Sequence, residues 1–311
     1  MKILLVNVTK DKGSTGRIVS SLFNEFKKQG HDVKLIYGRG PKTKHSDFFI
    51  KKTCELESKF CHLLSLFTGD LYGLMLISTH RIKKAIKKIN PDVINLHCIN
   101  GYFVNIYRLL KWLAKKNYKT ILTMHAEFMM TGGCGYTIEC NHHINCECKN
   151  CKFIKEINGK YSLNRTHHFY KKMEKSILCF SKDKLKISCV SPWLTKRFKE
   201  SPIYKNYEIK TIINPVDEIF FTNSDISPYL TKNNILYVTP DISDYVKTGW
   251  LIRDIARRRP DLNFTIVCGK QIDFEFDENN IKYISGGLGK EKLVCKLIDT
   301  ESYYVFETKE I

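Results

Sequence analysis

A strand, a turn, a helix and a second strand follow one another at the start of the chain, and this pattern limits the fold more than any other feature. Residues Lys2–Val8 form a short apolar run that ends at a glycine-containing turn. The next stretch, Arg17–Lys28, has apolar residues at the spacing of one helix face, and Asp32–Tyr37 predicts a second strand. Such a β-α-β unit belongs to an open parallel sheet, which binds its ligands beyond the carboxyl ends of its strands.

The same alternation continues to the end of the sequence. We predict further strands at Asp92–His97, Lys119–Met124, Lys186–Val190, Asn234–Thr239, Leu262–Val267, Ile281–Ile284 and Tyr303–Phe306. We predict helices at Arg81–Ile89, Val104–Lys116, from Pro192 onward and at Val246–Arg258. Because 311 residues exceed the usual size of one core, we expect an α/β protein of two Rossmann-like lobes. Around residues 214–234 the alternation gives way to a stretch rich in loop-forming residues, which we take as the linker. The predicted first lobe is therefore 1–215, the linker 216–233 and the second lobe 234–311.

Charge narrows the class of partner. The formal net charge is +19, from 51 Lys and Arg against 32 Asp and Glu, which favours phosphates, nucleic acids or an anionic membrane face. The lysines are scattered and the chain has no recognisable nucleic-acid motif, so we expect no nucleic-acid partner. The basic stretch Arg81–Lys88 is either a solvated helix face or a contact with anionic lipid.

The sequence also bears on the compartment. No apolar run reaches the ~20 residues of a membrane-spanning helix, and the first residues fit a strand better than a signal peptide. We therefore expect a cytoplasmic protein. In a reducing compartment, clustered cysteines more often bind metal or stay free thiols than form disulfides.

Five of the 12 cysteines fall between Cys134 and Cys151. The pair Cys148 and Cys151 has the spacing of a structural zinc knuckle, and four thiolates suit tetrahedral Zn²⁺. The predicted zinc ligands are Cys134, Cys140, Cys148 and Cys151. Two alternatives stay open: free thiols, and, with the basic charge, a zinc-containing nucleic-acid binder.

The segment Gly13–Arg17 is a candidate phosphate site. Its glycines let a phosphate approach the backbone, and the helix that follows offers unpaired N–H groups and partial positive charge. The plainer interpretation is a strand-to-helix turn whose glycines serve geometry alone. The segment lacks both the dinucleotide fingerprint and the ending of a P-loop.

Three polar residues stand at or just beyond strand ends. His97, Asn100 and His125 would line the same crevice as Gly13–Arg17, because the carboxyl ends of parallel strands share one edge of the sheet. Each of the histidines could instead be a hydrogen-bonded structural residue.

Several stretches occur in an order typical of one enzyme family. They are Gly69–Gly73, Ile89–His97, Ile99–Ile106, Thr123–His125, Thr131–Cys134, Val190–Leu194 and Ile213–Asp217. In this ordered set the chain resembles glycosyltransferase family 4, in the branch that builds bacterial capsule, colanic-acid-like and O-antigen polysaccharides. The resemblance runs from residue 1 to about 220 and is diffuse beyond.

The resemblance implies a GT-B fold, in which an acceptor-binding lobe and a nucleotide-sugar-binding lobe face a central cleft. It implies a hexosyltransferase that retains the anomeric configuration, needs no metal for catalysis, and moves sugar from a nucleoside diphosphate to a lipid-linked or polysaccharide acceptor. It places Gly13, Gly16 and Arg17 on the donor phosphates and His125 at the transferred sugar. His97 and Asn100 would then lie on the acceptor side.

The same resemblance also implies donor-binding residues in the second lobe and an association with the membrane. Lys247 resembles the lysine that holds the donor diphosphate, and Glu310 resembles the first acid of a donor-binding pair whose second member has no counterpart here. We therefore expect a shortened, incomplete second lobe. This leaves an inactive remnant that acts as a binding module as the alternative to an enzyme. The acceptor class implies peripheral association with the inner face of the cell membrane.

Overall fold

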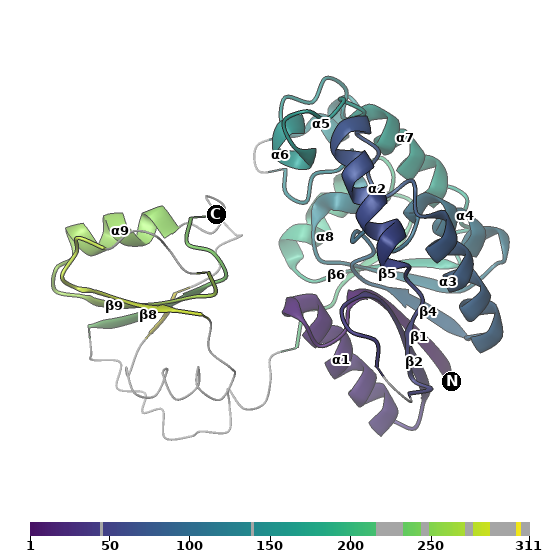
Figure 1. The fold of residues 1–311 in the computed structure, drawn as a ribbon, viewed down its shortest axis with the longest axis horizontal. Coiled ribbons are helices and arrows are strands. Elements are labelled where there is room, and N and C mark those ends of the chain that lie inside the picture. Colours follow the sequence, from purple (N-terminus) through teal and green to yellow (C-terminus); the bar gives the residue numbers. More distant parts are fainter. Residues whose placement is uncertain are drawn as a thin grey trace. The chain divides into compact units, whose positions relative to one another are not determined.

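The computed structural model describes residues 1–43, 46–137, 140–215, 233–243, 249–270, 276–286 and 303–305. The chain forms two compact units, Met1–Asn214 and Pro215–Ile311 (Figure 1). Each unit is built on a parallel sheet. Nearly all of the predicted linker, 216–233, lies outside the described residues.

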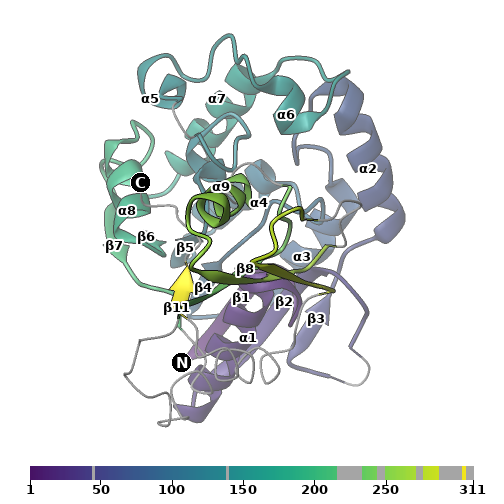
Figure 2. The same ribbon diagram turned by 90° about the vertical axis from the view of Figure 1, so that its left-hand side faces the viewer.

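The sheet of the first unit has seven strands in the order β3-β2-β1-β4-β5-β6-β7, and all its neighbours pair in parallel. Figure 2 shows β3 beside β2 and β7 beside β6. The strands are β1 (Lys2–Thr9), β2 (Asp32–Arg39), β3 (Phe49–Lys51), β4 (Val93–Leu96), β5 (Thr120–Met124), β6 (Leu185–Cys189) and β7 (Glu208–Thr211).

Helices connect these strands. They are α1 (Gly13–Lys28), α2 (Glu55–Thr68), α3 (Leu76–Ile89), α4 (Ile106–Lys115), α5 (His142–Asn145), α6 (Ile154–Asn158), α7 (Thr166–Ile177) and α8 (Pro192–Glu200), with a 3₁₀ turn, η1, at Glu127–Met130. Pro192 opens α8, where a missing N–H costs nothing, and Ser191 caps that helix by accepting from the Leu194 N–H.

The alternation of side chains along β1 builds a core on each face of the sheet. Leu4 and Val6 point into the larger cluster, which includes residues of α3 and α4. Ile3 and Leu5 point to the other face, where they pack with Val19 and other apolar residues of α1. In Figure 1, α1 lies on one side of the strands and α3 and α4 lie on the other. A β1 that is buried on both faces explains its nearly continuous apolar sequence.

The second unit has a four-stranded parallel sheet in the order β10-β9-β8-β11. Its elements are β8 (Asn234–Thr239), α9 (Gly249–Arg258), β9 (Asn263–Cys268), β10 (Ile281–Ser285) and β11 (Tyr303–Val305). Apolar residues of α9 and the sheet, among them Ile252 and Ile266, form its core. No helix among the described residues is long and apolar enough to cross a membrane.

The structure corrects two of the predicted segments. The Gly13–Arg17 segment is the first turn of α1 and not a separate loop before a helix at Arg17. The basic helix predicted at Arg81–Ile89 begins five residues earlier, at Leu76, because the Glu57 carboxylate accepts from the N–H groups of Ile77 and Ser78 at its start.

Candidate active site

Two histidines meet beyond the carboxyl ends of neighbouring strands. His97 directly follows β4 and His125 directly follows β5, and these strands pair in parallel. The Nδ1 atom of His97 lies 3.1 Å from the Nε2 atom of His125. His97 is only 5% exposed, and His125 is half-buried. The structure thus brings together two of the three strand-end residues singled out in the sequence.

Burial keeps both imidazoles neutral, because a charged ring would lose its hydration there. The pKa of His125 falls to about 4. The pKa of His97 falls to about 3, first through burial and then through the neighbouring charge of a protonated His125. Near pH 7 one ring therefore donates and the other accepts across their contact. The Nε2 atom of His97 is buried without a hydrogen-bond partner among the described residues.

Asn7 ties the end of β1 to the end of β4. Its Oδ1 atom accepts from the backbone N–H of Cys98, and its Nδ2 group donates to the carbonyl of Thr9. The backbone N–H of His97 donates to the carbonyl of Val6, so the ends of β1 and β4 are held together beside the histidines. Asn7 is fully buried and was not among the predicted site residues. The sequence feature that could have identified Asn7 is its position as a single amide in an otherwise apolar strand, because a buried polar group needs hydrogen-bond partners.

The Gly13–Gly16 turn brings the start of α1 to this same edge. Gly13 has a φ of +70°, a conformation that favours glycine, and a Cβ on Gly16 would lie 2.8 Å from the Oγ1 atom of Thr9. The N-cap residue of α1, Lys12, makes no side-chain capping bond, and the first turn has no acidic residue. The first N–H groups of α1 are therefore suited to an anion. Arg17, in the next turn, is exposed.

A contact between Thr15 and Cys98 joins this turn to the histidine strand. Burial raises the pKa of the Cys98 thiol, and a hydrogen bond with the Thr15 side chain opposes that shift. Cys98 directly follows His97 in the chain. The start of α1 and the end of β4 therefore form one site within the first unit.

Asn100 lies half-buried in the loop between β4 and α4. The next residue, Gly101, packs so tightly that a Cβ there would lie 2.1 Å from the Cγ2 atom of Val8 in β1. The loop is thus pressed against the end of β1, and Asn100 belongs to the same edge of the sheet as His97.

The cysteine-rich segment gathers four of its five thiols around one small cavity, of about 10 Å³. Its lining includes the four predicted zinc ligands and two histidines: Cys134, Cys140, Cys148, Cys151, His142 and His143. Burial, with the neighbouring thiols, raises the pKa of Cys134 and of Cys148 to about 12. Among the described residues, the cysteines are free thiols and no three Cys, His, Asp or Glu side chains are placed as ligands of one metal ion. The zinc site therefore stays a prediction.

A buried ion pair fastens this segment to α8. The Glu127 side chain is 1% exposed, and its Oε1 atom lies 2.8 Å from the Nε atom of Arg197 in α8. The same carboxylate accepts from the N–H and the hydroxyl of Thr137, and Arg197 also donates to Asn141. Sequence reasoning missed this group, because a single Glu and a single Arg seventy positions apart carry no pairing signal.

The predicted donor residues of the second unit, Lys247 and Glu310, lie outside the described residues.

Comparison with known protein families matches residues 15–218 to Glycosyltransferase Family 4, which is about two thirds of the chain. The chain belongs to this family. The glycosyltransferase resemblance of the sequence is thereby confirmed, and the matched region contains the histidine pair, Gly16 and the cysteine-rich segment. No curated protein matches the sequence significantly.

The fold of this glycosyltransferase is similar to those of several solved structures. Sucrose-phosphate synthase from Thermosynechococcus elongatus is 11% identical, with a TM-score of 0.55, over 97% of this chain and 73% of its own. An α-glucosyltransferase in complex with UDP is 12% identical, with a TM-score of 0.50, over 97% of this chain and 72% of its own. A second structure of an α-glucosyltransferase, holding UDP and a 13-mer DNA with a central A:G mismatch, gives the same identity and TM-score. These likenesses confirm the predicted α/β fold of the GT-B type.

Proposed function

We propose that this member of Glycosyltransferase Family 4 is a retaining hexosyltransferase. It would move a hexose from a nucleoside diphosphate to a precursor of a surface polysaccharide, such as a capsule, O-antigen or exopolysaccharide chain. The observation that carries the proposal is the pair of neutral histidines at the strand ends, joined through Cys98 and Thr15 to the uncapped start of α1. The UDP in the similar α-glucosyltransferase structures supports a nucleotide sugar as donor.

The start of α1 would hold the donor diphosphate. As the sugar bond breaks, negative charge accumulates on the leaving nucleoside diphosphate, and fixed N–H dipoles and cations stabilise it. The first turn of α1 offers such N–H groups and contains no acidic residue itself, and Arg17 adds a cation in the next turn. Lys247 and Glu310 are proposed donor ligands on the strength of the family resemblance alone.

His125 would contact the transferred sugar. Its Nε2 atom is engaged with His97, while its Nδ1 atom makes no hydrogen bond to a described residue and is left for a sugar hydroxyl. A neutral imidazole suits this task, because it can donate or accept without adding a charge beside the reacting carbon. His97 is then a positioning residue that fixes the tautomer of His125, and Asn100 lies on the acceptor side.

Release of nucleoside diphosphate tests the proposal. The purified chain would be incubated with a panel of UDP-, GDP- and dTDP-hexoses and lipid-diphosphate acceptors, and donor binding would be measured by calorimetry. We expect turnover with one donor class, and a loss of about 10²- to 10³-fold in kcat for His125→Ala. His80→Ala, an exposed histidine on α3, is the matched control and should keep full activity.

Two other results would count against this proposal. No binding and no turnover with any donor would exclude a nucleotide-sugar enzyme. Binding of a donor without turnover, in the presence of acceptors, would favour the alternative of a binding module.

A further inference from the structure

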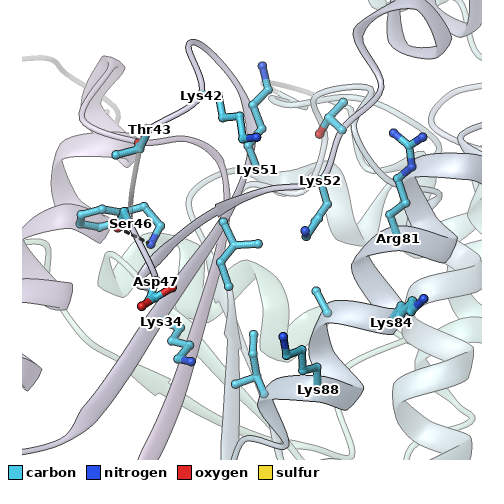
Figure 3. Close-up of a pocket in the computed structure, with 15 residues that line it drawn as sticks. Lys34, Lys42, Thr43, Ser46, Asp47, Lys51, Lys52, Arg81, Lys84 and Lys88 are labelled. Carbon is cyan, nitrogen blue, oxygen red and sulfur yellow. Dashed lines mark hydrogen bonds between the residues drawn. The ribbon is translucent and has the colours of Figure 1, made fainter.

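A groove lined by cations runs along one edge of the first unit's sheet. It has a volume of about 990 Å³ and lies between α3 and the strands β2 and β3. Its lining includes one carboxylate, Asp47, and seven cations: Lys34, Lys42, Lys51, Lys52, Arg81, Lys84 and Lys88. In Figure 3 the side chains of Lys52 and Lys88 point toward the open space, and Arg81 and Lys84 lie along the rim that α3 forms. A hollow with this excess of one charge suits an anionic ligand.

Most of these cations have no counter-charge within the described part of the chain. Among the seven, Lys51 pairs with Glu55, and the other six make no ion pair to a described residue. The one carboxylate of the lining, Asp47, is exposed. Like charges held close together repel one another and oppose folding. An anion with several charges would remove this repulsion when it binds.

The cations form two rows on opposite walls of the groove. Arg81, Lys84 and Lys88 follow one another at intervals of three and four residues, which places them on one side of α3 over about 10 Å. On the sheet wall, Lys51 of β3 is in register with the β2 residue three positions beyond Lys34, so these two are also about 10 Å apart along the strands. Charges that repeat along a groove suit a chain with repeated anionic groups better than a single phosphate.

Apolar side chains lie in the same groove. Ile50, Ala85 and Ile89 line it and are half-buried. The aromatic residue among the described lining residues is Phe49, whose ring packs against that of Phe23 with 4.7 Å between the centroids. Single-stranded nucleic acid binds through aromatic rings on which its bases stack, and this groove offers no exposed ring among its described residues. A saccharide fits better, because its rings present C–H groups between their charged substituents.

One end of the groove lies at the edge of the sheet that holds the histidines. Lys42 comes after the end of β2 and Lys52 directly follows β3, so both lie beyond the carboxyl ends of their strands. The strand order β3-β2-β1-β4 sets three strand spacings, about 14 Å, between β3 and the strand that His97 follows. A chain that lies in the groove would therefore extend along this edge toward the histidine pair.

We propose that the groove binds an anionic saccharide chain, and that the acceptor of the sugar transfer is such a chain. Its anionic groups would be carboxylates or phosphates, which lysine and arginine bind alike through charge-assisted hydrogen bonds. The groove would hold the part of the acceptor that does not react, while the terminal sugar lies at Asn100 and the histidines. The identity of the acceptor rests on the proposed function, whereas the binding of an anionic saccharide by the groove does not.

Oligosaccharides of matched length test the proposal. Calorimetry on the full chain would compare an octamer of galacturonic acid with its methyl ester, which has the same backbone and no charge. A hexose octamer linked by phosphodiesters is the phosphate counterpart. We expect at least one of the charged octamers to bind ten times more tightly than the ester or better, with an affinity that falls as salt rises. The tighter of the two identifies the anion that the groove prefers.

Substitutions in the two walls locate the binding. Lys52→Glu/Lys88→Glu should weaken binding of the charged octamer by about a hundredfold at low salt, because two attractive contacts become repulsive. Lys84→Gln/Lys88→Gln removes charge from α3 alone and should weaken it by about tenfold. The matched control, Lys182→Glu/Lys199→Glu, changes two exposed lysines outside the groove and should bind as the unaltered chain does. Circular dichroism and thermal melting of each variant separate loss of binding from loss of fold.

Three results would overturn the proposal. They are equal affinity for the acid and its methyl ester, unchanged binding by the folded groove variants, and tighter binding of a thymidine octanucleotide or of anionic vesicles through the same lysines. Turnover of a nucleotide sugar by a chain that binds no anionic saccharide would refute this inference and leave the proposed function standing. Binding of the charged octamer without binding of any nucleotide sugar would count against the sugar transfer and leave the groove as a saccharide site.

Discussion

The Nδ1 atom of His97 and the Nε2 atom of His125 lie 3.1 Å apart, which couples the ionisation of the two rings. Both have a folded-state pKa below the ordinary value of 6.5, about 3 for His97 and about 4 for His125. Between these values and 6.5 the unfolded chain binds more protons than the folded one. The free energy of unfolding therefore falls as the pH is lowered from about 6.5 toward 4.

This linkage can be measured against a variant without the pair. Between pH 7.5 and pH 5, the pair should lose about 2 to 4 kcal/mol of its stabilisation relative to His97→Gln/His125→Gln, as judged by urea unfolding. The difference isolates the two histidines from the eight others in the chain. An unfolding free energy that depends on pH equally in both proteins would contradict the buried, neutral state.

The contact between Gly16 and Thr9 predicts the effect of added volume at the start of α1. A Cβ at Gly16 would displace the Thr9 hydroxyl, which donates to the carbonyl of Lys12. We expect Gly16→Val to lower the free energy of unfolding by about 1 to 3 kcal/mol and to weaken donor binding. Gly135→Val is the control, since a Cβ at Gly135 would meet nothing within 4 Å, and its cost should stay within about 0.5 kcal/mol.

Removing Arg197 should be among the more damaging changes in the first unit. Arg197→Met leaves the carboxylate of Glu127 buried without its cation, which typically costs about 3 to 5 kcal/mol. The double variant Glu127→Gln/Arg197→Met should recover much of that loss in thermal or urea unfolding. Lys186→Met, which breaks the exposed pair with Glu208, should cost about 1 kcal/mol or less. If Lys186→Met and Arg197→Met lowered the free energy of unfolding by similar amounts, the buried pair would be no more important to stability than the exposed one, against this prediction.

Metal analysis decides between the zinc site and free thiols. We expect about one zinc per chain by plasma mass spectrometry, because four thiols line one cavity in a segment with little other apolar support. Cys148→Ser should lose the metal, whereas Cys179→Ser, at an exposed thiol, should keep it. A zinc-free protein whose melting temperature does not respond to a chelator would leave the thiols free.

Elements with one clear pattern were predictable from the sequence. The bounds of β8 agree with the prediction at both ends, and β4, β5, β6 and β9 differ by one or two residues, because each is an apolar run between polar breaks. Helix α2 was not predicted, since its buried side is made of Ser58, Cys61 and Ser65 and so lacks an inward apolar stripe. The three residues of β3 are too few to show a period.

Some features of the candidate site were also predictable from the sequence, and others were not. His97 and His125 were visible because strand ends in a parallel sheet share one edge. Their hydrogen bond, their neutral state and the bridging role of Asn7 depend on side-chain directions that only packing decides. The Glu127–Arg197 pair joins segments seventy residues apart, and its burial comes from the three-dimensional fold rather than from either local sequence.

The parallel pairing of β1 has a consequence for synthesis of the chain. Its first neighbour, β2, is thirty residues away, but its second, β4, pairs Val93 with Ile3 across ninety. As the chain leaves the ribosome, one edge of β1 keeps its backbone N–H and C=O groups unpaired until Val93–Leu96 has emerged. The β1–β4 pairing therefore waits until the stretch from Asp32 to Asn90 has been made, and during that time the open edge of β1 is exposed to wrong pairings.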